Sequence, residues 1–202
     1  MNTTQKKSTP VSTVTAKILC EVDAIRNTGG GKALLANLRG SIGRELGRTS
    51  AVWPLLFEHL PDSYLSRNGE PTKEELAILY ALQNYALYQQ GCDASVLLKE
   101  EKQFRPNFGE SLADLRTEKE REAMDRRFRI LITANNFSQF EHRTRQMMQI
   151  LKARTKSSTP VDFSNLAGDF YWFLRGYQED VRFRWAEAYY RRIKKEKGEK
   201  NA

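Results

Sequence analysis

Residues 116–156 read RTEKEREAMDRRFRILITANNFSQFEHRTRQMMQILKARTK. Apolar residues recur in this stretch at helical spacing, which predicts two amphipathic helices at about 117–134 and 137–153. Eleven basic residues stand against five acidic ones, so this fifth of the chain carries six of its eight net positive charges. The charge therefore lies on helices that pack against a core. A planar guanidinium can donate two parallel hydrogen bonds to phosphate oxygens, so a fixed arginine array favours nucleic acid as the partner.

The rest of the chain predicts helices as well, and the fold class is all-α. Thr72 and Glu75 match a capping box before a helix that Gly91 closes, and Trp53-Pro54 opens a short one. Further helices are expected at about 12–26, 32–46, 162–174 and 178–195, with a Gly29-Gly30-Gly31 connector after the first. We expect an N-terminal helical domain over 1–105, with 1–11 disordered. A C-terminal antiparallel helical bundle with a basic tail then occupies 106–202.

Composition favours a polyanionic partner. The chain has 202 residues, a net charge of +8 and a sequence pI near 9.5. Residues 1–10 lack the apolar core of a signal peptide, and no apolar run approaches the roughly 20 residues of a membrane span. Cys20 and Cys92 do not form a spaced pair. We expect a cytoplasmic protein with no membrane partner and no small-molecule substrate.

Enzymatic chemistry has little support in the residues. His59 and His142 are far apart and lack neighbouring Cys or Asp ligands, so no metal site and no cofactor are expected. The Gly29-Gly30-Gly31-Lys32 run lacks the spacer and the Ser or Thr of a phosphate loop. No nucleophile with a partnering base is evident, so we expect no catalytic residue.

The C-terminal third is rich in aromatic residues. Phe170, Phe173 and Tyr177 are three and four residues apart, which is typical of a helix face in a bundle core. Exposed rings can instead stack on unpaired bases. Trp172 and Tyr190 are the residues for which both interpretations stay open.

Several segments together resemble one family. They are 31–40 (GKALLANLRG), 53–54 (WP), 125–131 (DRRFRIL), 161–163 (VDF), 169–171 (DFY) and 185–190 (WAEAYY). This combination, across about residues 14–192, is similar to the CasB family, the small subunit of the type I-E CRISPR surveillance complex, Cascade. The resemblance implies an all-helical, non-catalytic subunit, of which two copies line the complex beside the guide RNA and the target strand. It also implies that a basic surface holds the displaced non-target DNA strand and stabilises the R-loop.

The resemblance places Arg39, Arg126, Arg127, Arg143 and Arg145 where the family contacts nucleic acid. Lys32, Arg44 and Arg48 are added on charge alone. Few acidic helical partners are evident for the first five, whereas Arg182 and Arg184 have Glu179, Asp180 or Glu187 nearby. Contacts of this kind bind the backbone without reading sequence.

Two other functions stay open. A free-standing helical nucleic-acid-binding protein would need a recognition helix with side chains directed at base edges. A protein-interaction adaptor would use the same arginines on an acidic protein. Sequence preference favours the first, and nuclease-insensitive protein binding favours the second.

Overall fold

The computed structural model describes residues 9–98 and 105–191, which form helices joined by loops, with no strand in these ranges. The all-α prediction is confirmed. The helices are α1 (Val11–Ile25), α2 (Gly29–Gly40), α3 (Trp53–Phe57), α4 (Lys73–Gln89), α5 (Phe108–Ala113), α6 (Arg121–Ile132), α7 (Phe137–Thr155), α8 (Phe163–Leu174) and α9 (Gln178–Arg191). Two 3-10 turns, Leu46–Arg48 and Ser50–Val52, precede α3.

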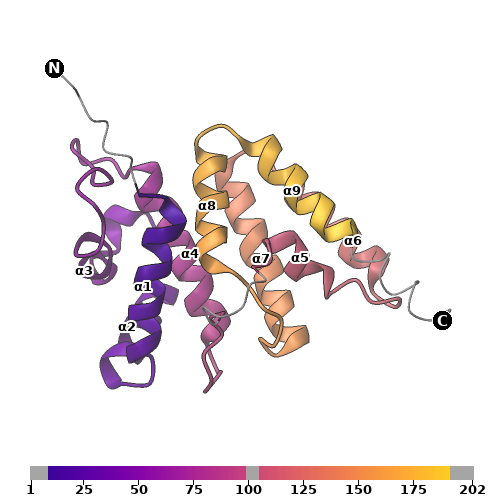
Figure 1. The fold of residues 1–202 in the computed structure, drawn as a ribbon, viewed down its shortest axis with the longest axis horizontal. Coiled ribbons are helices and arrows are strands. Elements are labelled where there is room, and N and C mark those ends of the chain that lie inside the picture. The colour runs from indigo at the N-terminus through magenta and orange to yellow at the C-terminus, as the bar shows by residue number, and fades with distance from the viewer. Residues whose placement is uncertain (1–8, 99–104, 192–202) are drawn as a thin grey trace.

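Helix α8 lies at the centre of the arrangement. It packs on α4 and α1 on one side and contacts α9 and α7 on the other. Figure 1 shows α1, α2 and α3 at one end of the molecule and α5, α6 and α9 at the other, with α8 between them. Buried apolar residues from both ends belong to one hydrophobic cluster. The predicted division into 1–105 and 106–202 stays a prediction.

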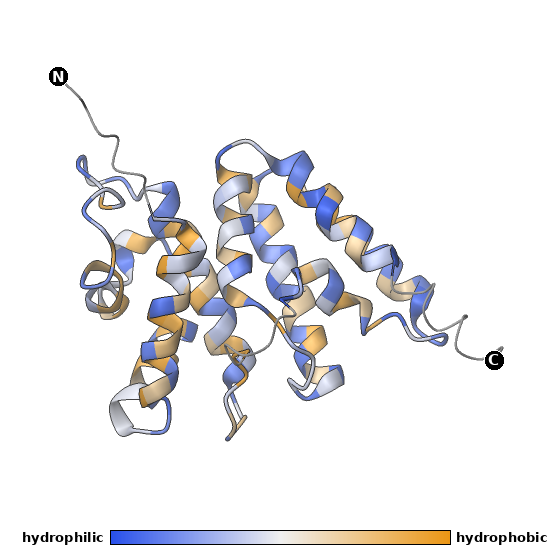
Figure 2. Cartoon of the chain, in the orientation of Figure 1, coloured by the Kyte–Doolittle hydropathy of each residue, from blue (hydrophilic) through white to orange (hydrophobic). Residues whose placement is uncertain are grey.

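Hydropathy explains why α8 is central and α9 is peripheral. Phe163, Leu166, Ala167 and Phe170 of α8 are all buried, and in Figure 2 α8 carries more apolar residues than α9. Helix α4 buries residues around most of its circumference, because its sequence is rich in apolar and alanine residues. A helix that is apolar on several sides must lie inside the fold, because exposure of each apolar face to water costs free energy.

The predicted capping box is confirmed at α4. Glu75 N donates to Thr72 Oγ1 at 3.1 Å, and Thr72 N donates to a Glu75 carboxylate oxygen at 2.7 Å. The glycine run was predicted wrongly as a connector, because Gly29–Gly31 form the first turn of α2 and Thr28 accepts from Gly31 N at 3.0 Å. A Cβ on Gly31 would overlap the carbonyl of Ile25, so glycine permits this tight passage from α1 to α2.

Other boundaries also differ from prediction. Helix α2 ends at Gly40 and not near 46, because Gly43 has a φ of +75° and turns the chain. Helix α5 lies in a segment for which no helix was predicted from the sequence. Val11, inside the segment predicted to be disordered, begins α1 and is buried. Residues 1–8, the basic tail 192–202 and the end of the last predicted helix lie outside the described residues.

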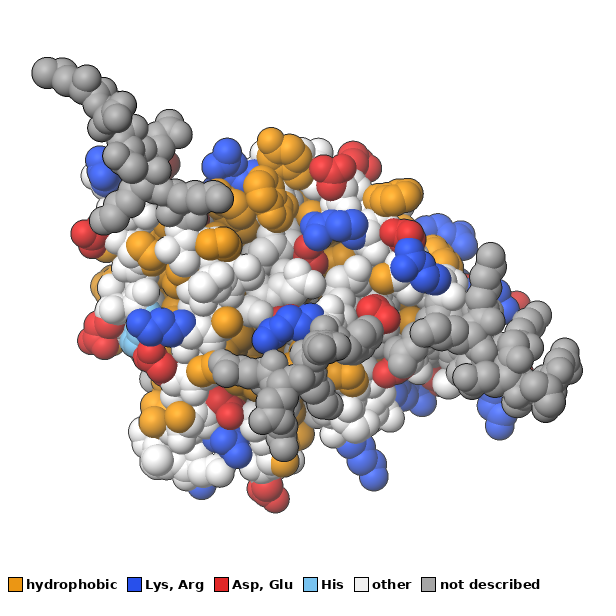
Figure 3. Space-filling view, viewed as in Figure 1, with side chains coloured by type: hydrophobic (Ala, Val, Ile, Leu, Met, Phe, Trp, Pro, Cys, Tyr) orange, Lys and Arg blue, Asp and Glu red, His pale blue; other side chains and the backbone are white. Residues whose placement is uncertain are grey.

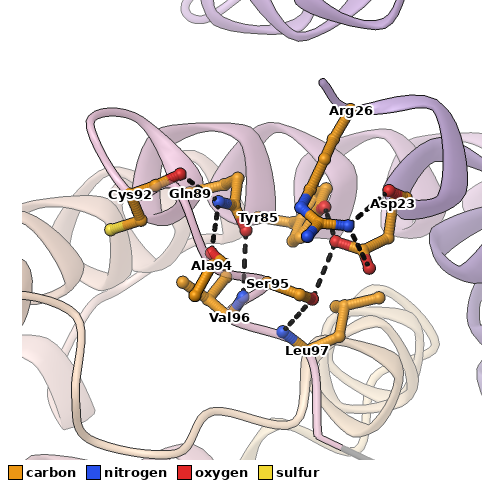
Figure 4. A network of polar contacts seen from close by, with 9 residues as sticks. All are labelled: Asp23, Arg26, Tyr85, Gln89, Cys92, Ala94, Ser95, Val96 and Leu97. Atoms are coloured by element: carbon orange, nitrogen blue, oxygen red, sulfur yellow. Dashed lines mark hydrogen bonds and ion pairs between the residues drawn. The ribbon is translucent and has the colours of Figure 1, made fainter. Parts of the chain in front are cut away.

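The loop after α4 is fixed by a polar network (Figure 4). The Gln89 amide donates to the backbone carbonyls of residues 92 and 94 and accepts from the backbone N–H of residue 96, at 2.8–2.9 Å. Tyr85 and Ser95 both donate to Asp23 Oδ1 at 2.8 Å, which ties α4 and the loop to α1. The Gln89 side chain thereby satisfies backbone groups of the loop, which have no partners in regular secondary structure.

A buried carboxylate joins α8 to α9. Trp185 Nε1 donates to Asp169 Oδ2 at 2.6 Å, and Arg184 donates to Asp169 Oδ1 at 2.8 Å. Burial raises the pKa of Asp169 to about 6, although the hydrogen bond from Trp185 and the charge of Arg184 oppose this change. The hydrogen bonds fix the rotation of α9 about its own axis, which orients its apolar face toward α5.

Asp169 should make stability depend on pH. The folded state holds the Asp169 proton up to about pH 6, whereas the unfolded chain releases it near 3.8. Its contribution to the free energy of unfolding is therefore greatest below pH 4 and falls as the pH rises through about 6. Relative to Asp169→Asn, the wild type should lose about 3 kcal/mol between about pH 4 and about pH 7, measured by urea unfolding. Parallel pH profiles of the two proteins would contradict this.

Gly109 permits the close crossing of α5 and α9. A Cβ at this position would overlap the backbone carbonyl of Trp185. Gly109→Ala must push the two helices apart and should lower the free energy of unfolding by about 1–3 kcal/mol. Gly40→Ala is the matched control, because its Cβ meets open space at the end of α2 and stability should stay the same or rise by up to about 1 kcal/mol. Equal thermal unfolding midpoints for the two variants would contradict the inference that α5 and α9 cross too closely for a side chain at Gly109.

Candidate nucleic-acid interface

A groove of about 650 Å3 runs between α6 and α7. Each helix contributes one face at helical spacing. The lining residues are Ala123, Arg126, Arg127 and Ile130 from α6, and Arg143, Gln146, Met147, Gln149, Ile150 and Ala153 from α7. The groove therefore combines arginines with an apolar surface, and it brings together Arg126, Arg127 and Arg143 of the residues predicted from sequence.

Packing of the opposite face of α6 determines where these arginines point. Met124, Phe128 and Leu131 are buried, and the Phe128 ring stacks on Tyr189 with centroids 3.8 Å apart. In a helix, residues three and four positions apart share a face. Burial of these three residues therefore leaves Arg126 and Arg127 exposed.

The groove arginines are uncompensated within the described part of the chain. Arg126 and Arg127 form no ion pair with any residue of 9–98 or 105–191. Arg143 NH1 donates to the neutral amide of Gln146 at 3.1 Å. Three positive charges at one groove create a local field that attracts anions.

Arg145 differs from its neighbours. It donates to Glu141, one turn earlier, at 3.0 Å, and its side chain is only 14% exposed. Burial raises the pKa of Glu141, and the charge of Arg145 offsets that rise in part. The expectation that few acidic helical partners are available to these arginines is wrong for Arg145, because Glu141 lies on the same face.

Arg116 is also neutralised, by an acidic partner inside the fold. It forms a two-point contact with Asp125, at 2.6 and 2.9 Å. Burial alone would raise the pKa of Asp125, but hydrogen bonds from Arg116 and Tyr189 and the charges of Arg116 and Arg121 outweigh burial and lower it. This pair anchors α6 to the chain before it and to α9, so Arg116 stabilises the fold.

Several further arginines have carboxylate partners. Arg154 contacts Glu120 at 2.6 Å, and Arg182 contacts Glu179, as the sequence predicted. Arg184 pairs with the buried Asp169 and with none of the acidic side chains expected for it. Figure 3 shows one face of the molecule, where Lys and Arg side chains are scattered and several stand beside Asp or Glu. Much of the positive charge is therefore locally balanced by carboxylates.

The N-terminal candidates lie elsewhere. Lys32 and Arg39 line a separate cavity of about 260 Å3 beside the end of α4. Arg39 NH1 donates to the Ala86 carbonyl at 3.2 Å, and burial lowers the pKa of Arg39. Arg44 is exposed and lines neither cavity, while Arg48 is 81% exposed and pairs loosely with Glu45 at 3.5 Å.

Lys152 is a basic residue that the sequence interpretation did not single out. Its Nζ donates to the Leu87 carbonyl at 2.7 Å, next to the carbonyl that Arg39 binds. Burial and the charge of Arg39 lower the pKa of Lys152, against an opposing effect of Cys92. Cations are favoured at a helix C-terminus, so the end of α4 attracts one side chain from α2 and another from α7.

The C-terminal aromatic residues are mainly core, as the spacing predicted. Phe170, Phe173, Trp185 and Tyr189 are buried. Tyr177 was wrongly expected to be core and is half exposed, because it follows α8 in the turn before α9.

Trp172 and Tyr190 are also partly exposed, and neither lines the groove. The Tyr190 ring contacts Phe128 edge to face at 5.8 Å and lies under the Arg116 guanidinium. Trp172 contacts Tyr177 at 5.2 Å.

Residues 9–98 and 105–191 were also compared with the requirements of a metal site and of a membrane span. In these ranges, no three His, Cys, Asp or Glu side chains converge as a metal site would require. No helix among them has the length and apolar character to cross a bilayer. His59 contacts Glu21 and the Leu55 carbonyl, so its ring takes part in packing.

Comparison with known proteins identifies the family. No curated protein sequence matches the chain. The fold is similar to that of CasB from Thermobifida fusca, with a TM-score of 0.69 and 21% identity, over 89% of this chain and 97% of that one. Residues 34–190, well over half of the chain, match the sequence model of a family described as CRISPR-associated protein Cse2. The resemblance to CasB is confirmed, and the chain belongs to the CRISPR-associated Cse2 family.

Proposed function

We propose that the chain is a non-catalytic small subunit of a type I-E CRISPR RNA-guided surveillance complex. In that complex it binds nucleic-acid backbone, stabilises the R-loop and holds the displaced non-target strand. Family membership supports the place in a CRISPR complex. Its partners are then the guide RNA, the target or non-target DNA strand and a second copy of the chain, in the cytoplasm.

The observation that carries the binding role is the arginine groove. Arg126, Arg127 and Arg143 line one groove and have no acidic partner among the described residues. Each can donate paired hydrogen bonds to a phosphate. Exchange of a DNA duplex for an RNA–DNA duplex is nearly balanced in free energy, so a few backbone contacts to the displaced strand can shift it.

The predicted residues can be ranked by whether their charge already has a partner within the protein. Arg126, Arg127 and Arg143 are the primary phosphate contacts. Lys32 and Arg39 form a second, smaller basic cavity, in which Arg39 is partly engaged with the fold. Arg145 supports the helix through Glu141 and contributes little directly.

Arg126→Gln combined with Arg127→Gln should weaken binding without unfolding the protein, because both side chains are exposed. Each lost phosphate contact reduces the log–log salt slope of single-strand binding by about 0.7, so the double variant should lose about 1.4. Fluorescence anisotropy of a labelled mixed-sequence strand over a salt series measures this. Within the reconstituted complex, the lifetime of the R-loop should fall in parallel.

The matched control is Arg67→Gln combined with Arg175→Gln. It removes the same net charge from exposed positions outside the groove. Binding and slope should stay near wild-type values in this control. Equal losses in the two double variants would indicate a diffuse charge effect, and unchanged R-loop lifetime in the groove variant at physiological salt would contradict the site.

A further inference from the structure

The apolar part of the groove has no role in backbone binding. Ile130 is 46% exposed on the same face of α6 as Arg126 and Arg127. Opposite it, α7 contributes Met147 and Ile150 to the lining. Phosphate contacts need cations and N–H donors only, so an apolar surface between the arginines points to a ligand that also has an apolar part.

We propose that this groove accepts an unpaired nucleobase of a single strand, whose flanking phosphates contact the arginines. This inference rests on the proposed function and specifies its ligand as single-stranded, base-bearing nucleic acid. The face of a base would lie on Ile130 and Ile150. Arg126 and Arg127 on one side and Arg143 on the other would bind the phosphates before and after it.

Size and charge both fit such a ligand. The groove, at about 650 Å3, lies within the range of about 300–1,000 Å3 that small-molecule sites occupy, and a nucleotide is a ligand of that class. The three arginines are exposed and form no ion pair with the described residues, so their guanidinium groups are available to bind an anion. A nucleotide combines a flat apolar face with an adjacent negative charge, and this matches an apolar surface bordered by cations.

Gln149 adds a polar group that a base can use. It is exposed and lines the groove, and its side-chain amide forms no hydrogen bond within the described residues. An amide can donate and accept at the edge of any base that is not already paired. In a duplex the bases are stacked and their pairing edges are occupied, so the groove should distinguish single strands from duplexes.

The test compares two labelled strands with equal numbers of phosphates. One is a thymidine strand of about 12 nucleotides, within the range of about 4–16 that single-strand-binding modules occupy, and the other is abasic throughout. The full chain should bind the base-bearing strand about tenfold more tightly at low salt, as burial of one partly exposed apolar side chain gives. Ile130→Ser should abolish this ratio and leave binding of the abasic strand unchanged.

Ile25→Ser is the matched control, because Ile25 is 43% exposed at the end of α1 and lies outside the groove. It should keep the ratio. Arg126→Gln combined with Arg127→Gln should weaken the binding of both strands equally, because it removes phosphate contacts and leaves the apolar surface in place.

The outcomes separate this inference from the proposed function. Equal wild-type affinity for the two strands, with a steep salt dependence, overturns base insertion and retains backbone binding. Equal losses for both strands in Ile130→Ser also overturn it. Failure to bind either strand, together with binding of a synthetic acidic amphipathic helical peptide, overturns both and assigns the groove to a protein.

Discussion

Burial of one apolar stripe on α6 and one on α7 determines which basic side chains of these helices reach the surface. Met124, Phe128 and Leu131 must face inward, and Phe128 stacks on Tyr189 of α9. Once this face is fixed, helical geometry decides which arginines reach solvent and which meet a carboxylate. The arrangement of charge is therefore a consequence of core packing, and it needs no special backbone conformation.

The same constraint divides the arginines into two groups with different chemistry. Arg116 and Arg145 lie toward the core and contact Asp125 and Glu141. Such pairs fix helix positions, because removing one partner would leave the other charge buried and uncompensated. The groove arginines face outward without acidic partners. Net charge alone cannot separate these groups. The distinction depends on the side of α7 for Arg145, and on the approach of the segment before α6 to Asp125 for Arg116.

The sequence was sufficient for much of the fold because periodicity and caps are local signals. The extents of α7 and α8 and the capping box at Thr72 depend on residues within a few positions. The end of α2 and the presence of α5 were missed, since Gly43 and the crossing of Gly109 over Trp185 act through backbone geometry and distant packing. The Lys152 contact to Leu87 joins segments 65 residues apart, so no local pattern could predict it. The Glu141–Arg145 pair, in contrast, was visible at a spacing of four.

Mixed apolar and cationic character in one groove has a consequence for how a strand could be held. Phosphate contacts alone favour any polyanion, and duplexes carry the higher charge density. An apolar surface favours only strands whose bases are free, so Ile130 and Ile150 would oppose the preference for duplex that the arginines create. A protein that must hold a displaced strand beside a re-forming duplex needs this apolar contact as well, because charge alone would stabilise the single strand and the duplex. The placement of Ile130 one turn beyond Arg126 and Arg127 supplies both kinds of contact from a single helix face.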